Sequence, residues 1–583
     1  MSAPTSSPSG VTLFKKLWPM ARPDGHLYLA SLVSAPLLVA LNLAQPYLLK
    51  VAIDDYITVG KLDGLQTVAL QYLATVILGF GLNAVFGLAT AVAGQRLIRR
   101  LREAILKHLL GLSPAWFDTR PAGELLTRGT SDVEALGETV SSGVVTIVMD
   151  VLIVIATLGA MVWLDWRLTL CLFLLAPPLI GVIEICRRGL RKHFNGMREG
   201  ISAVNSYLAE RVSGVEILQL FSAEDASARR FRALNRPYAE STIRSNVYDA
   251  LMYAAVDGVG SVAFALMLWY ATSSFGVGVS AGLLVAFIEY VNRLFTPLKE
   301  FSGKIAILQR ASTALDKIFS LLDETDHIPS GALALPKPSG SVRFEDVRFS
   351  YKPGPPEADI LKGVSFEVKP GQVVAIVGAT GCGKTTVTRL LSRTYAGYRG
   401  SITLDGGELS ALRLSDVRRA VASVSQDVQI FPETVRFNIG LGDPKLTDEK
   451  LMSAAELVCA DTLVRGLPGG LDEPLKERGG NLSVGEAQLF TFARTMAYDP
   501  TVVILDEATA SIDPVTERLI QRAIERILAE KTVIVIAHRL STIQAADLIV
   551  VMHQGEVSQM GTHEELLARG GRYAELHDAG FSS

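Results

Sequence analysis

The sequence predicts two domains of different class, an all-α membrane domain with six spanning helices followed by a water-soluble α/β domain. A chain of 583 residues is too long for one ordinary core. The hydrophobic fraction of 49% is high for a soluble protein, and most of the apolar excess precedes about residue 310. Beyond that point short Val/Ile runs alternate with glycines and charged residues, as in VVAIVGATGCGKTT, which is typical of an α/β domain.

The linker ETDHIPSGALALPKPSG is rich in Pro, Gly and Ser, which indicates a domain boundary near Ser341. We therefore expect an N-terminal cytosolic segment, a membrane domain, a linker and an α/β domain. Their ranges are 1–24, 25–312, 313–340 and 341–583. The net charge of −3 gives no support for nucleic-acid binding. The four cysteines are widely spaced and form neither a metal pattern nor a disulfide framework.

Six apolar stretches are long enough to cross about 30 Å of hydrocarbon. They are Leu27–Leu49, Val68–Ala93, Val144–Leu164, Leu168–Cys186, Val247–Trp269 and Val277–Leu294. Lys and Arg gather before the first span and after the second and fourth, whereas the loops on the other side carry few cations. The positive-inside rule therefore places both chain ends in the cytosol, with the protein in the cell (inner or plasma) membrane. The polar start MSAPTSSPSG lacks the pattern of a cleavable signal, so insertion relies on the first span.

Long charged segments separate spans two and three, and spans four and five, and we expect them to be helical hairpins that project into the cytosol. Their tips carry Trp116 and Phe117 in the first hairpin, and Leu220 and Phe221 in the second. These apolar side chains would be exposed unless a partner covers them, so a docking role is favoured over a solvated helix end. Phe117 and Phe221 are the candidate coupling residues.

Charged residues also fall within or at the edges of the apolar spans, among them Asp150, Asp257, Glu289 and Arg293. Charge in hydrocarbon is costly, so such residues usually face a bundle interior or an aqueous cavity. Asp257, Glu289 and Arg293 are candidate cavity residues. Glu289 and Arg293 stand four residues apart on one helix, so they could instead neutralise each other.

The segment VVAIVGATGCGKTT has the spacing of a phosphate-binding loop between a strand and a helix. The glycines let backbone N–H groups turn toward phosphates, Lys384 reaches the terminal phosphates, and Thr385 offers a hydroxyl to Mg²⁺. The candidate nucleotide-binding residues of the loop are Gly378, Ala379, Thr380, Gly381, Cys382, Gly383, Lys384, Thr385 and Thr386. The domain is therefore an α/β P-loop NTPase.

A second apolar run, in TVVILDEATA, leads into two adjacent carboxylates. A central strand would deliver Asp506 to the metal and Glu507 just beyond it, where a carboxylate can orient and deprotonate the attacking water. An acidic turn after a strand is common, but a phosphate loop in the same domain favours the catalytic interpretation.

These motifs, in this order, resemble the ATP-binding cassette transporters of the exporter type, in which membrane and nucleotide-binding parts are fused. Tyr351 in RFSYKP resembles the aromatic residue that stacks on adenine, and Gln426 in SVSQD the glutamine that touches the metal. Asp513 in SIDP resembles the dimer-contact loop, and His538 in VIAHRL the histidine on the γ-phosphate. The resemblance implies MgATP hydrolysis, with Glu507, His538 and Gln426 in catalysis and Thr385, Gln426 and Asp506 on the metal.

In this family two cassettes pair head to tail, so each ATP lies between the phosphate loop of one chain and the signature of the other. The stretch NLSVGE resembles the usual LSGGQ signature, with Leu482, Ser483, Val484, Gly485 and Glu486 in place. Val484 replaces a glycine, and a β-branched residue resists positive φ. Glu486 replaces a glutamine, and a carboxylate about 8 Å from a phosphate charge would oppose it by about 2 kcal/mol at an effective dielectric near 20, less the part that the adjoining helix N-terminus recovers. Ala487 and Leu489 replace common basic residues, so no side chain there offsets the charge.

The intact catalytic residues beside an altered signature favour a heterodimer with a different half-transporter, although a homodimer that tolerates both changes is the alternative.

The resemblance further implies that the hairpin tips rest in grooves of the cassettes and transmit their closure to the membrane helices. The expected substrate is a hydrophobic or amphipathic molecule, drug-like or lipid. A homodimeric lipid flippase and an ATP-regulated membrane assembly that does not transport are the competing functions.

Overall fold

The computed structural model describes residues 10–60, 63–139, 144–272, 279–352, 355, 358–424, 428–506, 513–537 and 539–578. The chain folds into two compact units, and the division between them is not linear in the sequence. The helical unit comprises Met1–Leu110 and Ala122–Glu324, and the α/β unit comprises Gly111–Pro121 and Thr325–Ser583. A short segment from the first half of the chain therefore packs with the second half.

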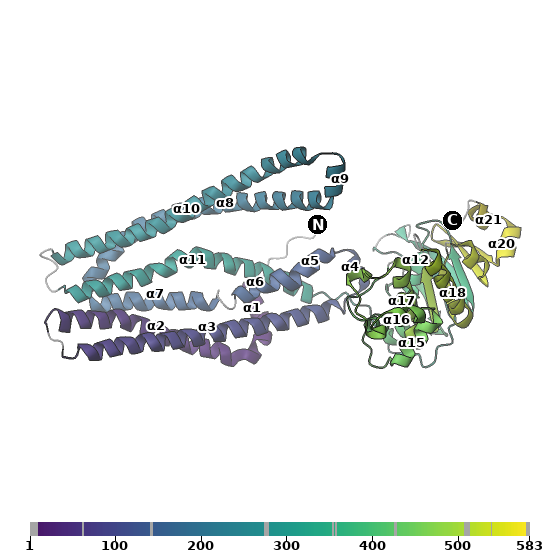
Figure 1. Ribbon diagram of the computed structural model, residues 1–583, viewed down its shortest axis with the longest axis horizontal. Helices are drawn as coiled ribbons and strands as arrows, with labels where there is room; N and C mark the ends of the chain where they lie inside the picture. The colour runs from purple at the N-terminus through teal and green to yellow at the C-terminus, as the bar shows by residue number, and fades with distance from the viewer. Residues whose placement is uncertain are drawn as a thin grey trace. The chain divides into compact units, whose positions relative to one another are not determined.

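The helical unit is built from a few very long helices and several short ones (Figure 1). They are α1 (Gly10–Ala21), α2 (Gly25–Val51), α3 (Leu65–Leu109), α5 (Ala122–Thr127), α6 (Val133–Glu138), α7 (Val144–Leu164), α8 (Trp166–Ser213), α9 (Val215–Leu220), α10 (Glu224–Thr272) and α11 (Ala281–Leu322). At 1.5 Å per residue, α8 with its 48 residues is about 70 Å long, more than twice the thickness of the hydrocarbon layer. These helices therefore extend well beyond the apolar stretches that the sequence marks.

Five helices of the described residues are long and apolar enough to cross a membrane. They lie at Lys16–Ile57, Leu65–Leu109, Thr146–Leu164, Trp166–Ser213 and Glu224–Thr272, and they correspond to the first five predicted spans, of which all but the first two residues of the third lie inside them. The sixth predicted span begins at Val277, outside the described residues, and continues into α11.

Local sequence explains where the long helices begin. The Asp165 carboxylate accepts hydrogen bonds from the backbone N–H groups of Arg167 and Leu168, at 2.8 and 3.1 Å, and so caps α8. Ser280 caps α11 in the same way by accepting from the Leu283 N–H at 3.1 Å. In both cases a side-chain oxygen satisfies N–H groups that have no partner inside the helix.

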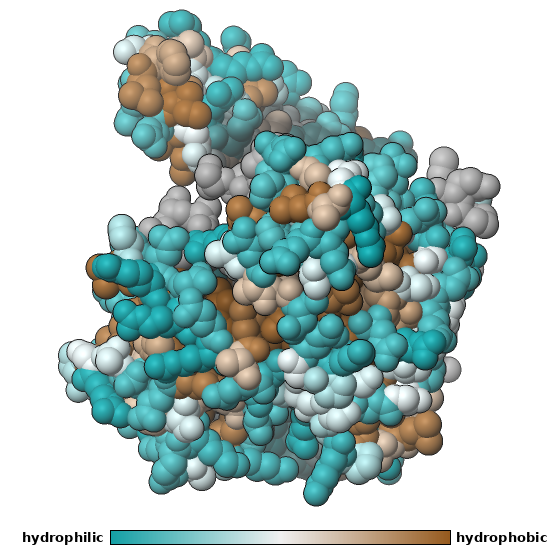
Figure 2. All heavy atoms as spheres, turned by 90° about the vertical axis from the view of Figure 1, so that its right-hand side faces the viewer, coloured by the Kyte–Doolittle hydropathy of each residue, from teal (hydrophilic) through white to brown (hydrophobic). Residues whose placement is uncertain are grey.

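Helices α8 and α10 pair along their length as a hairpin with α9 at its tip (Figure 1). Glycines permit the close approach, since a Cβ added at Gly200 would stand 2.9 Å from the Cβ of Tyr238. About two helical turns away along α8, His193 stacks on Tyr248 of α10 with ring centroids 5.7 Å apart. The apolar side chains at the tip remain exposed, with Leu220 at 74% and Phe221 at 79% of full exposure. Hydrophobic atoms are accordingly visible at the end of the hairpin, the lobe at the top of Figure 2.

The α/β unit contains two sheets. The six-stranded sheet has the order β10-β9-β3-β8-β7-β6, parallel except for β10, and the four-stranded antiparallel sheet has the order β2-β1-β4-β5. The strands are β1 (Val342–Phe349), β2 (Leu361–Val368), β3 (Val373–Val377), β4 (Arg399–Leu404), β5 (Gly407–Glu408), β6 (Val421–Val424), β7 (Val502–Asp506), β8 (Thr532–Ile536), β9 (Leu548–His553) and β10 (Glu556–Gly561). Strands β3 and β8 are buried at every residue, as expected for a parallel sheet covered on both faces.

Helices complete the α/β unit and cover its sheet (Figure 1). They are α4 (Pro114–Asp118), α12 (Lys384–Leu391), α13 (Leu414–Ala420), α14 (Val435–Gly440), α15 (Asp448–Leu457), α16 (Asp461–Gly466), α17 (Val484–Ala497), α18 (Pro514–Glu530), α19 (Leu540–Gln544), α20 (His563–Arg569) and α21 (Arg572–Asp578). Alternate residues of β3 point to two separate cores: Val373, Ala375 and Val377 to one, and Val374 and Ile376 to the other.

The linker between the units is bonded along the α/β unit. The backbone of Leu333 donates to the carbonyl of Ala411 at 3.0 Å and accepts from the N–H of Arg413 at 2.8 Å. The Asp405 carboxylate accepts from the N–H groups of Ser339 and Ser341 at 2.8 and 2.9 Å. Although its composition is typical of a loop, the segment is therefore an ordered part of the α/β unit.

Candidate nucleotide-binding site

The predicted phosphate loop connects β3 to α12 at the carboxyl end of the parallel sheet, where ligands bind in such folds. Gly383 has φ of +105°, and a Cβ there would stand 2.7 Å from a methyl of Leu361. Gly381 has φ of +83° with open space around it. Both glycines are thus required by backbone conformation, and the second also by close packing. The loop has the conformation that presents N–H groups to an anion.

Lys384 is 8% exposed, and its ammonium group is directed back over the loop. Its Nζ donates to the carbonyl oxygens of Gly378 and Ala379, at 2.7 and 3.2 Å. These bonds hold the charge above the loop in advance of a ligand, at the start of α12, where the helix dipole also favours an anion. Of the remaining loop residues, Ala379, Thr380, Gly381 and Thr385 are exposed, whereas Cys382 and Thr386 are buried.

Tyr351, the predicted adenine-stacking residue, lies beside the phosphate loop although 33 residues of sequence separate it from Lys384. Its hydroxyl is 3.1 Å from the hydroxyl of Thr386. Its ring meets that of Tyr395 edge to face, with centroids 4.9 Å apart and an angle of 82°. The side chain is 37% exposed, so one part of the ring remains accessible.

A divalent cation fits the residues at this edge of the sheet. Asp506 ends β7 and Thr385 follows β3, with β8 between those two strands, so both reach the carboxyl edge of one sheet. Hydroxyl and carboxylate oxygens are the donors that Mg²⁺ prefers, and Mg²⁺ usually takes only one or two protein ligands beside substrate phosphates. The described residues contain no cluster of three or more His, Cys, Asp or Glu able to hold a metal.

Three predicted catalytic residues, Gln426, Glu507 and His538, lie outside the described residues. Asp513 is described, and its carboxylate caps α18 by accepting from the N–H groups of Val515 and Thr516 at 3.0 and 2.9 Å. Hydrogen bonds from Thr516 lower the pKa of this carboxyl below its usual value. The structure therefore gives Asp513 a local capping role at the start of α18.

The signature residues form the N-terminus of α17, and Glu486 has a partner that we did not expect. The Glu486 carboxylate accepts from the Ser483 N–H at 2.7 Å, while the Ser483 hydroxyl accepts from the Glu486 N–H at 3.2 Å. This reciprocal pair is a capping box. The Glu486 charge is therefore stabilised by a backbone N–H together with the helix N-terminus, although no side chain offsets it at the positions of Ala487 and Leu489. The Ser-x-x-Glu spacing could have predicted this pair.

The other signature residues differ in exposure. Leu482 packs against the core, Gly485 is buried, and Val484 is 62% exposed at the surface. Ala487 and Leu489, which stand where the family commonly has basic residues, are buried in the core. The apolar character of these two positions therefore serves the packing of α17.

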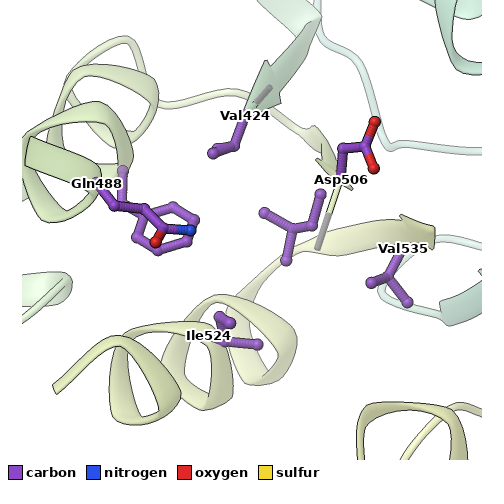
Figure 3. A pocket seen from close by; sticks show the side chains of 7 residues that line it. Val424, Gln488, Asp506, Ile524 and Val535 are labelled. Atoms are coloured by element: carbon purple, nitrogen blue, oxygen red, sulfur yellow. The ribbon is translucent and has the colours of Figure 1, made fainter. Parts of the chain in front are cut away.

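A cavity of about 10 Å³ lies behind the signature helix, between α17, β7 and α18 (Figure 3). Its lining is apolar apart from Gln488 and Asp506. It holds at most about one water molecule, so it is not a ligand site. Gln488 of α17, the helix that begins with the signature, and Asp506 of β7 both line this small cavity.

Arg293 faces the neighbouring helix α2 of the bundle and not Glu289 on its own helix. Its guanidinium donates to the carbonyl oxygen of Asn42 at 2.5 Å and to Oε1 of Gln45 at 2.7 Å. Pro46 lacks the N–H that would bond the Asn42 carbonyl within α2, so Arg293 satisfies a group that the proline leaves open. No ion pair joins Arg293 to the exposed Glu289 among the described side chains, because the cation faces α2 instead.

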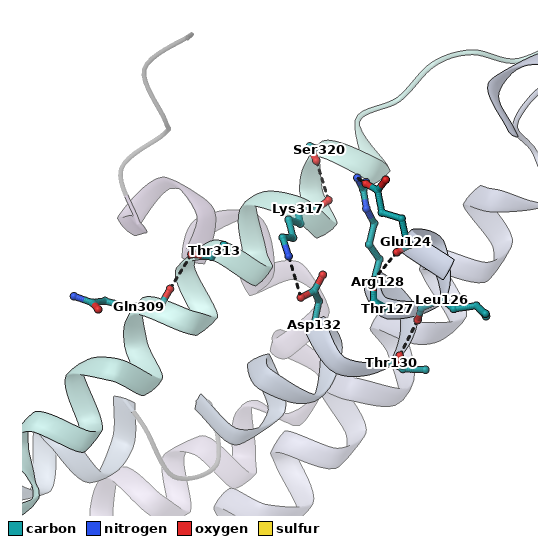
Figure 4. A network of polar contacts seen from close by, with 10 residues as sticks. All are labelled: Glu124, Leu126, Thr127, Arg128, Thr130, Asp132, Gln309, Thr313, Lys317 and Ser320. Atoms are coloured by element: carbon teal, nitrogen blue, oxygen red, sulfur yellow. Dashed lines mark hydrogen bonds and ion pairs between the residues drawn. The ribbon is translucent and has the colours of Figure 1, made fainter. Parts of the chain in front are cut away.

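The other charges of the membrane spans are arranged in two ways. Lys304 on α11 forms ion pairs with Asp150 on α7 and, at 2.8 Å, with Glu300. Asp257 and Glu289 are exposed on α10 and α11. Further along α11 a polar network reaches the π-helical turn η3 (Arg128–Asp132), where Lys317 pairs with Asp132 at 3.6 Å (Figure 4). Polar contacts thus hold α11 to its neighbours over much of its length.

The two predicted coupling residues lie in different surroundings. Phe117 on α4 is 38% exposed, and its neighbour Trp116 is buried at 3%. Phe221 follows α9 and is almost fully exposed. The sequence marked the first tip correctly as apolar, but the residue that is buried there is Trp116. An aromatic pair in sequence carries no signal that tells which ring is covered.

Comparison with known proteins covers nearly the whole chain. Residues 28–298 match the family model described as the ABC transporter transmembrane region, and residues 361–510 match the model described as ABC transporter. The ATP-dependent lipid A-core flippase of Nitrosococcus oceani is 32% identical over 571 residues, which are 98% of this chain and 95% of the relative. The "Probable multidrug resistance ABC transporter ATP-binding/permease protein YheH" of Bacillus subtilis is 33% identical over 494 residues, 84% of this chain and 72% of the relative.

A solved structure described as a bacterial Atm1-family ABC exporter with ATP bound resembles the fold of this chain. The TM-score is 0.75 at 26% sequence identity, and the likeness covers 96% of this chain and 98% of the other. The arrangement of a helical unit and an α/β unit in one chain is therefore shared over the full length.

Proposed function

The chain belongs to the ABC transporters of the exporter type, and we propose that its substrate is a hydrophobic or amphipathic molecule, drug-like or lipid. It binds ATP, and its ATPase activity is coupled to transport. The observation that carries the substrate class is the full-length similarity to a relative named as a lipid A-core flippase, beside one named for multidrug resistance. In support of this class, the Arg293 guanidinium already donates to the Asn42 carbonyl and to Gln45 of α2, so this charge is engaged within the protein.

In the proposed reaction Lys384 holds the terminal phosphates above the loop, and Tyr351 stacks on the adenine. Thr385, Asp506 and Gln426 would hold Mg²⁺, which supplies a positive charge that stabilises the phosphate oxygens as the bond breaks. Glu507 orients the attacking water and accepts its proton, and His538 contacts the γ-phosphate. Binding of two ATP molecules closes the two cassettes and shifts the membrane helices from an inward-open to an outward-open arrangement, and hydrolysis resets them.

The protein spans a membrane, and the proposed location is the cell membrane with the α/β unit and both chain ends in the cytosol. The cations that flank the apolar stretches support this orientation. In the proposed dimer the exposed apolar tip at α9 rests on a cassette, which would bury Leu220 and Phe221.

ABC exporters act as dimers, and for this chain the proposed partner is a different half-transporter. Two features of the signature support the proposal. Val484 stands exposed at the position of a glycine, and the Ser483 hydroxyl and the Glu486 carboxylate each accept from the other residue's backbone N–H. A signature built in this way would serve the slower of two ATP sites, whereas the intact phosphate loop would meet a standard signature from the partner.

The first experiment tests the ATPase assignment. Protein reconstituted in lipid should hydrolyse MgATP, and Glu507→Gln should lower turnover by about 10²- to 10⁴-fold while nucleotide still binds, because only the proton acceptor is lost. Retained turnover in this variant, with the partner's own site disabled, would contradict the role of Glu507. ATP-driven uptake of lipid or of a hydrophobic dye into inside-out vesicles separates an exporter from a non-transporting assembly.

The second experiment tests the heterodimer. Expression of this chain alone should give little turnover at paired sites, since both sites would then carry the altered signature. A stable homodimer with full, substrate-stimulated activity at two equivalent sites would establish the homodimeric flippase instead. In the heterodimer, Val484→Gly with Glu486→Gln should raise hydrolysis mainly at the site formed with the partner's phosphate loop.

A further inference from the structure

Helix α4, the tip of the first hairpin, is bonded into the α/β unit of its own chain. Its neighbouring backbone is held by two contacts with the linker: the Ser113 N–H donates to the Asp326 carbonyl at 2.8 Å, and the Gly111 carbonyl is 2.6 Å from His327 Nδ1. Trp116 is buried, and Ala115 packs on the core that contains the inner residues of β1 and β2. The helix therefore sits on the α/β unit as an integral part of it.

The last residue of α4 is bonded to a tyrosine beside the nucleotide site. The Tyr395 hydroxyl donates to the carboxylate of Asp118. Tyr395 is 7% exposed and lies just after α12, the helix that begins with the phosphate-loop lysine. A hydroxyl bonded to a carboxylate is a charge-assisted hydrogen bond, which is short and directional. The position of α4 and the position of the Tyr395 ring are therefore linked.

The Tyr395 ring in turn contacts Tyr351 and the helix α12 that follows the phosphate loop. It meets the Tyr351 ring edge to face at 4.9 Å, and the Arg389 guanidinium of α12 lies 5.6 Å from its centre. The Tyr351 hydroxyl is 3.1 Å from the Thr386 hydroxyl in the phosphate-loop helix. Edge-to-face rings have a preferred mutual orientation, so a rotation of one ring changes the best position of the other.

We propose that Tyr395 is a positioning residue that reports an adenine nucleotide on Tyr351 to helix α4 through Asp118, within a single chain. The proposal rests on the proposed function, since it deepens the role of Tyr351. A base stacked on Tyr351 limits the motion of that ring, which limits the motion of Tyr395 and strengthens its hold on Asp118. The α4 tip thus responds to nucleotide before the two cassettes close, and closure then acts on a tip already fixed.

The test uses the full-length protein in lipid nanodiscs and measures hydrogen exchange of the backbone amides at 112–120, which reports local opening of α4. The probe is ADP, which occupies the phosphate loop but lacks the γ-phosphate that the opposite signature contacts. Saturating ADP should slow exchange at 112–120 by about fivefold or more, the range typical of coupled sites. Slowed exchange at 379–386 in the same sample shows that the loop is occupied.

Matched variants identify the path. Tyr395→Phe keeps the ring against Tyr351 but removes the hydroxyl, so the slowing at 112–120 should disappear while that at 379–386 remains. Asp118→Asn keeps an acceptor for the Tyr395 hydroxyl, so the slowing at 112–120 should remain, whereas Asp118→Ala should abolish it. The double variant Asp118→Ala with Tyr395→Phe should show no larger loss of slowing than either single variant, because both changes break the same hydrogen bond. Tyr398→Phe is the control, since the Tyr398 hydroxyl bonds to Glu408 at 2.6 Å instead.

Two outcomes overturn the proposal. One is full slowing at 112–120 in Tyr395→Phe with the loop occupied. The other is a combination of two results: ADP does not slow exchange at 112–120 in the unaltered chain, but ATP does so in Glu507→Gln. The signal would then pass through closure of the dimer and not through Tyr395 within one chain. A chain that shows the ADP effect yet hydrolyses no ATP would contradict the proposed function and leave this path standing.

Discussion

The two hairpin tips have similar composition and opposite surroundings. The first tip, α4, belongs to the α/β unit, with Trp116 at 3% exposure and backbone bonds to the linker. The second tip, α9, belongs to the helical unit, with Phe221 at 79% exposure. An apolar tip can be buried by its own chain or remain exposed and available to another chain, and composition does not distinguish the two cases. The second tip is thus where a dimer would add contacts that one chain lacks.

The largest expected effect separates the tips by stability. Trp116→Ala removes a buried indole and should cost about 3 kcal/mol, the usual range for such a truncation, which corresponds to about 100-fold faster exchange at 112–120. The measurement is hydrogen exchange of the full-length protein in lipid. Trp163→Ala is the matched control, because that indole is exposed. Unchanged exchange in Trp116→Ala would mean that burial of the indole does not hold α4.

The next effect concerns function at the second tip. Leu220→Asp with Phe221→Asp should lower transport at least about tenfold while ATP turnover persists, because a charged tip would be poorly accepted by an apolar groove on a cassette. The measurement is uptake per ATP hydrolysed in inside-out vesicles. Ile243→Asp is the control, since Ile243 is an exposed apolar residue of α10 away from the tip. Normal coupling in the double variant would leave α9 as an ordinary solvated end.

A smaller effect tests the linker contact of the first tip. His327→Ala removes the side chain that lies 2.6 Å from the Gly111 carbonyl, and a net loss of about 1 kcal/mol should raise exchange at 112–120 about fivefold. Asp326→Ala is the matched control, because Asp326 contributes its backbone carbonyl, which the substitution retains. Equal exchange in both variants would show that the histidine adds nothing to the docking of α4.

The smallest effect is expected at Phe117. Its ring is 38% exposed, so Phe117→Ser should change the stability of the first tip by about 0.5 kcal/mol, as is usual for partly exposed positions. In the transport assay Phe117→Asp should have less effect than the double substitution at the second tip. A larger loss of transport in Phe117→Asp would restore Phe117 to the coupling role that the sequence predicts and reverse the order of the two tips.

The parts of the fold that the sequence predicted best are those in which one short segment contains all the information. The phosphate loop is such a segment, since a β-branched run, spaced glycines and a following helix former are adjacent in VVAIVGATGCGKTT. The capping box of Ser483 and Glu486 is equally local, and it could have been predicted from the spacing of those two residues. The comparisons confirm the family and the two fold classes, whereas the roles of the individual site residues stay predictions.

Contacts between distant segments were not predictable in the same way. The partner of Arg293 is a carbonyl on α2, opened by Pro46, and it lies about 250 residues away in sequence. From one helix alone, a pair with Glu289 was one of two open alternatives beside a cavity role, because residues four apart on a helix are neighbours. The membership of 111–121 in the α/β unit is a second case, since only the contacts of the folded chain show which unit this segment joins.

The sequence by itself determined the classes of the two domains, the place of the phosphate loop and the apolar character of the spans and tips. Hydropathy and glycine spacing are patterns contained in one segment, so they can be interpreted without knowing which other segments lie beside it. Only the tertiary structure decided that Arg293 faces α2, that Trp116 is the buried ring of the first tip, and that Tyr395 joins Asp118 to Tyr351. The reason is physical: hydrogen bonds and ring contacts depend on distances of a few ångströms between segments, which one sequence does not specify.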